Sequence, residues 1–127
     1  WKNNLIKKEN VRFLGYVEEK DKPYIYNLAS VFVYPSYYEG FGLPLLEAMA
    51  CDTPVIAGLN SSQGEVVGQA GIMVDPYNLN EIRQAIEAIL NSGRLRENLV
   101  QSGLARVKEF SWEKTAEQFL NLYEDNH

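Results

Sequence analysis

A short glycine loop joins a predicted strand to a predicted helix, and it constrains the fold more than any other segment. The apolar run Val31–Tyr34 is typical of a buried strand, and Pro35 ends it. Gly40-Phe41-Gly42 forms a turn, and a helix begins near Leu43 with Pro44 in its first turn, where the missing N–H of proline costs nothing. The pattern predicts a strand–loop–helix unit of an α/β protein.

Two carboxylates bracket the start of that helix, Glu39 in the loop and Glu47 about one turn in. In an open α/β sheet, ligands bind at the carboxyl ends of the strands. Free backbone N–H groups and the helix dipole favour an anion such as a phosphate there. Carboxylates instead accept hydrogen bonds from hydroxyls, as on a sugar and a ribose. The segment therefore predicts a site for a sugar nucleotide.

The spacing of the two glutamates is not specific by itself. The chain has 13 Glu in 127 residues, so about one pair at this spacing is expected by chance. A second pair does occur, Glu109 and Glu117, in a charged helical region without a nearby glycine, where we expect solvated helix faces. The first pair is distinguished by its context, a strand followed by PSYYEGFG and then LPLLEAMA.

In that context the segment resembles the donor-binding signature of the retaining glycosyltransferases of family 4, which have the two-domain GT-B fold. The ordered motifs that carry the resemblance cover residues 11–112 almost without a gap. They comprise residues 11–17 (VRFLGYV), 53–57 (TPVIA), 64–68 (GEVVG), 71–76 (GIMVDP) and 110–112 (FSW).

The resemblance implies an α/β fold, a Rossmann-like parallel sheet with flanking helices that is the incomplete C-terminal half of a GT-B glycosyltransferase. Residues 1–127 would be a partial nucleotide-sugar-binding domain that lacks its first two βα units and the whole N-terminal domain. The family sheet has six strands in the order 3-2-1-4-5-6, and the strands here match the third to the sixth. We expect either a fragment with an open sheet or direct pairing of 11–14 with 31–34, because an isolated strand edge is a liability.

Hydrophobic periodicity and capping residues predict the elements. The four strands lie at 11–14, 31–34, 55–57 and 72–74, and the helices at 1–9 (a helix tail), 19–30, 43–51, 79–91, 94–109 and 111–127. Helix 19–30 would turn Tyr24, Ile25, Leu28 and Ala29 inward. Asn78 and Glu81 resemble a capping box. Ser111 would cap the C-terminal helix 111–127, whose apolar stripe is Trp112, Ala116, Phe119, Leu120 and Tyr123.

The resemblance also assigns the two glutamates. Glu39 matches the first glutamate of the family motif, which implies hydrogen bonds to donor-sugar hydroxyls near the anomeric centre and a catalytic role in positioning and charge stabilisation. Glu47 matches the second, which implies that it accepts hydrogen bonds from the ribose hydroxyls. The alternatives are an exposed loop carboxylate at 39 and a carboxylate that complements the helix dipole at 47.

The remaining donor-binding candidates follow from matching segments. Backbone N–H groups of Gly40, Phe41, Gly42 and Leu43 would contact the sugar and diphosphate, although Phe41 could instead plug the core. Tyr16 and Val17 match the segment that contacts the base, and Ser62 and Glu65 lie in a loop that faces the same crevice. Gln63-Gly64 replaces the family's leucine-proline, so we expect a more flexible loop and leave the role of Glu65 open.

Charge and residue composition limit the classes of ligand and partner that the chain could bind. The net charge of −5 argues against nucleic acid. Cys51 is the one cysteine, so no intrachain disulfide forms, and a reducing compartment is expected. No His, Cys and carboxylate cluster has metal-ligand spacing, and the one histidine, His127, is the last residue. The resemblance implies transfer without a metal or other cofactor, the nucleotide-diphosphate sugar being a substrate.

We therefore expect part of a retaining glycosyltransferase that resembles a hexosyltransferase. We expect it to be cytoplasmic, and contact with the inner face of the membrane through the N-terminal domain stays open. The acceptor would be a sugar, lipid or polysaccharide held by that domain, so the isolated chain would be inactive, and it would self-associate or be only partly ordered. The alternatives are a non-catalytic nucleotide-sugar-binding or partner subunit, and another GT-B enzyme such as a nucleotide-sugar epimerase. The base, sugar and linkage stay open.

Overall fold

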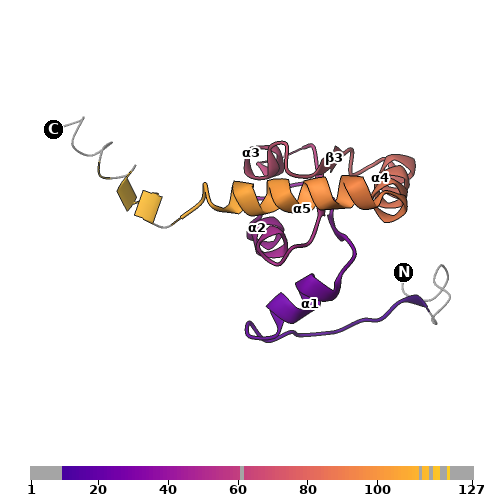
Figure 1. Cartoon of the computed structure of the whole chain (residues 1–127), viewed down its shortest axis with the longest axis horizontal. Coiled ribbons are helices and arrows are strands. Elements are labelled where there is room, and N and C mark those ends of the chain that lie inside the picture. The colour runs from indigo at the N-terminus through magenta and orange to yellow at the C-terminus, as the bar shows by residue number, and fades with distance from the viewer. Residues whose placement is uncertain (1–9, 61, 112, 115, 118–119, 121–127) are drawn as a thin grey trace.

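Three parallel strands form the sheet in this computed structural model, which describes residues 10–60, 62–111, 113–114, 116–117 and 120 (Figure 1). The strands are β1 (Phe32–Tyr34), β2 (Val55–Gly58) and β3 (Ile72–Val74), in the order β1-β2-β3. Val33 lies opposite Ile56, and Ala57 opposite Met73. This arrangement confirms the parallel α/β prediction and three of the four predicted strands.

Helices alternate with the strands, as expected for right-handed βα units. They are α1 (Lys22–Leu28), α2 (Leu43–Ala50), α3 (Gln63–Val67), α4 (Leu79–Asn91) and α5 (Gly93–Val107). In Figure 1 α5 runs along the body of the domain, and α1 lies apart from it beyond α2. The helices predicted at 43–51, 79–91 and 94–109 are therefore present within one or two residues.

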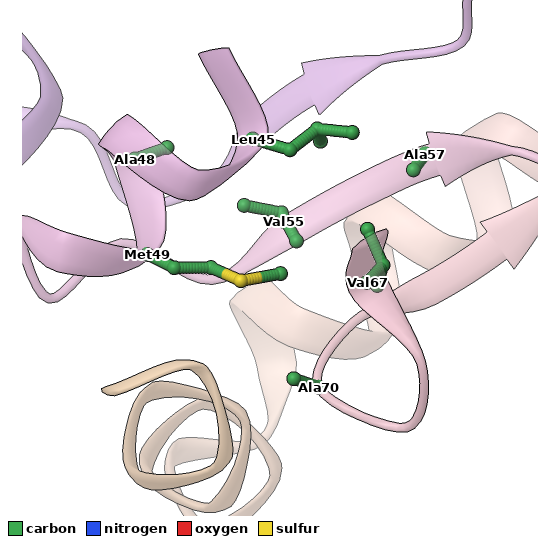
Figure 2. Packing of buried hydrophobic residues seen from close by; sticks show 7 residues of the cluster. All are labelled: Leu45, Ala48, Met49, Val55, Ala57, Val67 and Ala70. Atoms are coloured by element: carbon green, nitrogen blue, oxygen red, sulfur yellow. The ribbon is translucent and has the colours of Figure 1, made fainter. Parts of the chain in front are cut away.

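The core is built on both faces of β2, whose residues are all buried. Val55 and Ala57 face one side and pack against Leu45 and Met49 of α2 and Val67 of α3 (Figure 2). Because side chains alternate along a strand, the intervening residue of β2 faces the opposite side. A strand buried on both faces requires helices on both faces, which fixes the layered α/β architecture.

The second layer is formed by α4 and α5. Ile56 of β2 packs there with Ala85 and Ile89 of α4 and Leu99 of α5. Helix α5 also reaches the first layer, where a Cβ on Gly103 would lie 3.2 Å from Cγ of Met49. The glycine lets α5 approach α2 closely and joins the two layers.

Side-chain caps place the helix starts as the sequence predicts. Asn78 Oδ1 accepts from the Glu81 N–H at 3.1 Å, which is the first bond of the predicted capping box. The Glu81 carboxylate does not complete the box at Asn78, because it accepts from the N–H of Asp75, the residue after β3, at 3.2 Å. Ser111 Oγ accepts from the Lys114 N–H at 3.1 Å, the expected N-cap of the last helix. Of the predicted stripe, Ala116 and Leu120 are exposed, and Trp112, Phe119 and Tyr123 lie outside the described residues, as does the predicted tail 1–9.

The predicted strand at Val11–Leu14 is wrong. The segment has no strand structure, and it does not pair with β1, which within the described residues pairs only with β2. Phe13 is 71% exposed, so the apolar run that suggested a buried strand is not buried here. A strand is stable only beside a paired strand, and in the described part of the chain the sheet consists of β1, β2 and β3 alone.

The predicted inward face of the first helix is also wrong. Tyr24 is 71% and Leu28 85% exposed, whereas Ile25 is 37% exposed and Ala29 is half-buried. Tyr26 turns inward instead and meets Phe32 edge to face, with ring centroids 5.2 Å apart. The contacts of Tyr26 with Phe32 of β1 and with Glu47 of α2, and not the apolar periodicity, set which side of this short helix packs.

Gly71 offers a test of the packing between β2, α3 and β3. A Cβ there would lie 2.7 Å from Cγ2 of Val55 and 2.7 Å from Cγ1 of Val67. Gly71→Ala should therefore destabilise the protein by about 1–3 kcal/mol through overpacking. Gly93→Ala is the matched control, because its Cβ would meet no atom within 4 Å. Urea unfolding of both variants checks this, and equal stabilities would contradict the described packing.

Candidate functional site

Glu39 lies in the loop after β1, with its carboxylate turned back to the end of that strand. Oε1 accepts from the Tyr34 hydroxyl at 2.5 Å and from Ser36 Oγ at 3.3 Å. The hydrogen bond to Glu39 raises the pKa of Tyr34. Within the described residues, no basic side chain forms an ion pair with Glu39. The carboxylate is thus oriented by neutral donors and keeps acceptor capacity for a ligand.

Glu47 lies in the second turn of α2 and faces α1. Its Oε2 accepts from the Tyr26 hydroxyl at 3.0 Å. Burial, and then this hydrogen bond, raise the pKa of Tyr26 to about 12. The carboxylate lines a pocket of about 270 Å³ between α1 and α2. The lining residues are Glu19, Lys22, Pro23, Tyr26, Glu47, Ala50 and Cys51.

The backbone between the two glutamates turns sharply at Gly42. This residue has φ +92°, a left-handed conformation that favours glycine, and it precedes the first turn of α2. Gly40 and Leu43 are exposed on either side. Phe41 is also exposed, and its ring meets that of Phe110 edge to face with centroids 5.9 Å apart. Phe41 is therefore not a core residue. The loop presents main chain at a helix start, as an anion site requires.

Helix α3 holds the loop in place through its first residues. Ser62 Oγ donates to the carbonyl of Glu39 at 2.9 Å. Gln63 is fully buried: its Nε2 donates to the Ser36 carbonyl at 3.3 Å, and its Oε1 accepts from the Gly58 N–H at 2.8 Å. The amide of Gln63, where the sequence predicted a more flexible loop, thus connects the loop to the segments after β1 and β2.

Three of the predicted donor-binding residues, Glu65, Tyr16 and Val17, make no described contact with the loop. Glu65 is exposed in the first turn of α3, and no described contact brings its carboxylate to Glu39. Tyr16 is 89% exposed and Val17 half-buried, both in the segment before α1. The hydrogen bond to Glu19 raises the pKa of Lys22, and both residues line the pocket together with Glu47.

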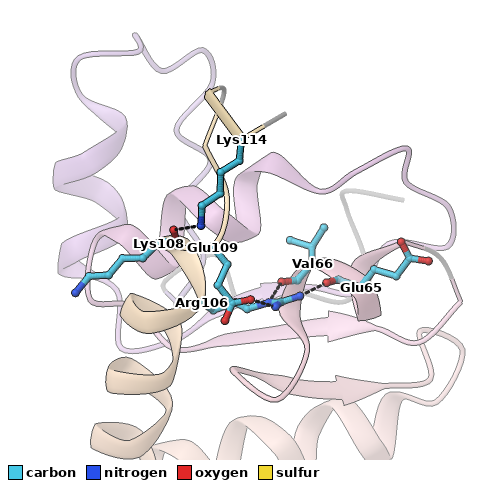
Figure 3. Close-up of polar contacts among 6 residues, drawn as sticks. All are labelled: Glu65, Val66, Arg106, Lys108, Glu109 and Lys114. Carbon is cyan, nitrogen blue, oxygen red and sulfur yellow. Dashed lines mark hydrogen bonds and ion pairs between the residues drawn. The ribbon is translucent and has the colours of Figure 1, made fainter. Parts of the chain in front are cut away.

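Arg106, from the last turn of α5, holds the other end of α3 (Figure 3). Its Nε donates to the Val66 carbonyl at 2.9 Å, and it also contacts the Glu65 carbonyl and the Glu109 carboxylate. The guanidinium lies over the Phe110 ring, 4.9 Å from its centroid. Because Phe110 contacts Phe41, α5 meets the site loop by a second route.

Sequence reasoning missed Gln63, Arg106 and Lys22 as parts of the site. Gln63 had a signal, a polar residue where the resembling pattern has an apolar one. Arg106 had none, since a lone arginine near a helix end is ordinarily a surface residue. In the described part of the chain, no three His, Cys, Asp or Glu side chains are grouped to hold a metal ion. No helix there is long and apolar enough to cross a membrane.

Comparison with known proteins gives consistent matches. Residues 1–106 match the family model described as glycosyl transferases group 1. The chain is 48% identical over 113 residues to O-antigen chain mannosyltransferase B of Escherichia coli, covering 89% of this chain and 30% of that protein. It is 35% identical over 111 residues to a serotype-specific mannosyltransferase of Escherichia coli, of which it covers 14%.

Solved structures also resemble the chain. Sucrose-phosphate synthase from Thermosynechococcus elongatus matches with TM-score 0.81 and 37% identity, over 92% of this chain and 30% of that one. The C-terminal domain of a glycosyl transferase group 1 family protein from Francisella tularensis matches with TM-score 0.68 and 30% identity, over 76% of this chain and 51% of that one. The chain therefore spans less than a third of the mannosyltransferases that it matches.

The buried amide of Gln63 can be tested by an apolar replacement of similar shape. Gln63→Met should destabilise the protein by about 1–3 kcal/mol, because the Gly58 N–H and the Ser36 carbonyl lose their partner. Gln84→Met, on the exposed side of α4, is the control and should be near neutral. Denaturant midpoints of the two variants measure the difference, and a neutral Gln63→Met would refute the bridge.

Tyr26 predicts how stability changes at high pH. Its folded-state pKa, about 12, lies above the reference value of 10.0, so its contribution is complete below pH 10 and is lost as pH rises towards 12. The free energy of unfolding should thus fall more steeply across this range in the wild type than in Tyr26→Phe, which cannot ionise. Urea titrations between pH 9 and about 11.5 compare the two, and parallel pH profiles would show that Tyr26 is not held by Glu47.

Proposed function

Because the chain belongs to the group 1 glycosyltransferase family, with its GT-B fold, we propose that its strand-end site binds a nucleotide-diphosphate sugar for retaining transfer. The names of two relatives, both mannosyltransferases, favour mannose as the sugar. The acceptor is a growing glycan, as the words "O-antigen chain" in one of those names suggest.

One observation carries the proposal: two carboxylates flank the glycine start of α2, and each is oriented by hydroxyl groups. The described hydrogen bonds to Glu39 come from Tyr34 and Ser36, and that to Glu47 comes from Tyr26. A carboxylate has about four acceptor positions, so each keeps room for hydroxyls of a ligand. The helix start between them suits a phosphate.

From these positions we assign each residue to one part of the donor. Glu39 accepts hydrogen bonds from the donor sugar, and Glu47, at the pocket beside α1, accepts them from the ribose. Gly40, Phe41, Gly42 and Leu43 offer backbone N–H groups to the sugar and diphosphate. Tyr16 and Val17 lie towards the base, and Ser62 steadies the carbonyl of Glu39. Glu65 contributes only if the ligand reaches the exposed side of α3.

In the reaction, the bond between the anomeric carbon and the leaving phosphate oxygen breaks, and the acceptor oxygen attacks from the same face. The acceptor proton passes to the departing phosphate, which then leaves as the nucleoside diphosphate. Glu39 orients the sugar and stabilises the positive charge that develops on it. Neither a metal nor another cofactor takes part in this scheme.

Two other functions remain as alternatives to a transferase. A nucleotide-sugar epimerase would need a ligand held similarly but no acceptor, and the transferase names of the relatives count against it. A non-catalytic binding or partner subunit would keep the nucleotide pocket without needing an oriented Glu39. The hydrogen bonds that the Tyr34 and Ser36 hydroxyls donate to Glu39 orient this carboxylate, and this favours a catalytic role over binding alone. Transfer also requires an acceptor-binding domain, so the isolated chain should show no turnover.

Separate changes of the two glutamates test the proposal in the intact protein. Glu39→Gln should lower kcat, since it weakens contacts to the reacting sugar, whereas Glu47→Gln should mainly raise the KM for the donor. Each lost hydrogen bond to a carboxylate costs about 1.5–3 kcal/mol, roughly 10- to 150-fold. Initial rates with a panel of UDP-, GDP- and ADP-sugars measure both parameters.

Glu87→Gln is the matched control, because this exposed glutamate of α4 pairs only with Arg83 across one helical turn. It should leave both parameters within about twofold. Full activity in both Glu39→Gln and Glu47→Gln would reject the assigned site.

A further inference from the structure

Two exposed tyrosines stack on each other at the carboxyl edge of the sheet, outside the contacts described so far. The rings of Tyr37 and Tyr77 lie 4.6 Å apart, tilted by 36°. Tyr37 follows β1, in the loop that carries Glu39, and Tyr77 follows β3. Because β2 lies between those strands, the ring pair spans the end of the middle strand.

The pair remains open to solvent despite this contact. Tyr37 is 58% exposed and Tyr77 is 72% exposed. Tyr38, beside the first ring, is also exposed. Aromatic side chains with this much free surface at the ligand-binding edge of an α/β sheet indicate a binding surface rather than core packing.

The backbone under each ring is held in place. Ser36 Oγ lies 3.2 Å from the Tyr38 carbonyl and 3.3 Å from Glu39 Oε1, so its one hydroxyl hydrogen is shared between two acceptors on either side of the turn. The Asp75 carboxylate accepts from the Tyr77 N–H at 2.9 Å, and the Asp75 carbonyl accepts from the Asn78 N–H at 2.9 Å. A surface that is already ordered loses little conformational entropy when it binds a ligand.

We propose that the Tyr37–Tyr77 pair is a stacking platform for the acceptor glycan, beside the donor site. One face of a pyranose ring presents C–H groups that pack on an aromatic ring, while its hydroxyls remain free at the rim. Tyrosine suits this ligand, because the ring is apolar and the hydroxyl is a hydrogen-bonding group. The Asp75 side chain lies next to Tyr77, where sugar hydroxyls would reach it.

A glycan is favoured over another protein domain as the occupant by two observations. The platform is continuous with the loop of Glu39, which lies two residues beyond Tyr37, so a glycan on it would lead towards the donor sugar. Each ring also lies two residues from a carboxylate, Glu39 for Tyr37 and Asp75 for Tyr77, and carboxylates accept hydrogen bonds from the hydroxyls of a glycan. The inference rests on the proposed function, since only a transferase of this kind needs an acceptor at this edge.

The test measures acceptor and donor kinetics of the intact protein, with mannotriose as the acceptor probe. Tyr37→Ala and Tyr77→Ala should each raise the acceptor KM by roughly three- to tenfold and leave the donor KM unchanged. Tyr37→Phe and Tyr77→Phe keep the stacked rings and should stay within about twofold. Tyr24→Ala is the matched control, because this tyrosine is 71% exposed, like Tyr77, but lies in α1 and not in a loop that follows a strand.

Direct titration of mannotriose, followed by NMR shifts of the tyrosine rings, gives a readout that does not need turnover. Shifts lost in both alanine variants and kept in Tyr24→Ala would support the platform. Unchanged mannotriose binding and acceptor KM in the alanine variants would overturn it. A rise in the donor KM instead would place the rings in the donor site. A lower unfolding midpoint with a normal acceptor KM would show that the rings form a contact between domains. Either result would also overturn the proposed platform.

Failure of the platform can be told apart from failure of the proposed function. If the intact protein binds no UDP-, GDP- or ADP-sugar, the proposed donor site is wrong. If it binds and transfers normally while the tyrosine variants behave like the wild type, only the platform is wrong.

Discussion

The side-chain amide of Gln63 controls the geometry of the whole strand-end site. The pairing of β1 with β2 ends at Tyr34 and Ala57, and the segments that follow these two strands are not paired with each other. Gln63 fills the space between them, accepting from the Gly58 N–H and donating to the Ser36 carbonyl. A buried amide with both ends bonded is strongly directional, since any displacement leaves a polar group unpaired.

The position of Glu39 follows from this bridge. Ser36, whose carbonyl Gln63 holds, also donates its hydroxyl to the Glu39 carboxylate, and Ser62 next to Gln63 holds the Glu39 carbonyl. Arg106 fixes the opposite end of α3 by donating to its last carbonyls. A single five-residue helix thus connects α5 with the catalytic candidate, which is how a loop residue can be held with the precision that a site needs.

The sequence was most informative where one face of the chain is buried. Strands 32–34, 55–58 and 72–74 and helices α2, α4 and α5 were predictable, because β2 is buried on both faces and the helices have strong periodicity or caps. The strand at 11–14 was not, because no described strand pairs with it. The inward face of α1 was not either, because the contacts of Tyr26 with Phe32 and Glu47 set which side of the helix packs. Glu39 and Glu47 could be found from the glycine loop between them. The role of Gln63 was signalled only by a polar residue at an apolar position of the pattern, and that of Arg106 not at all, because both depend on contacts with residues 27 to 41 positions away.

The central claim is that Glu39 recognises the donor sugar and Glu47 the ribose of one ligand. Calorimetric titration of the intact protein with a nucleotide sugar, and with the nucleoside diphosphate that lacks the sugar, tests it most directly. The account predicts that Glu47→Gln weakens both ligands by the same factor, whereas Glu39→Gln weakens only the nucleotide sugar. If Glu39→Gln weakens both ligands equally, or Glu47→Gln neither, the assignment of the two carboxylates is wrong.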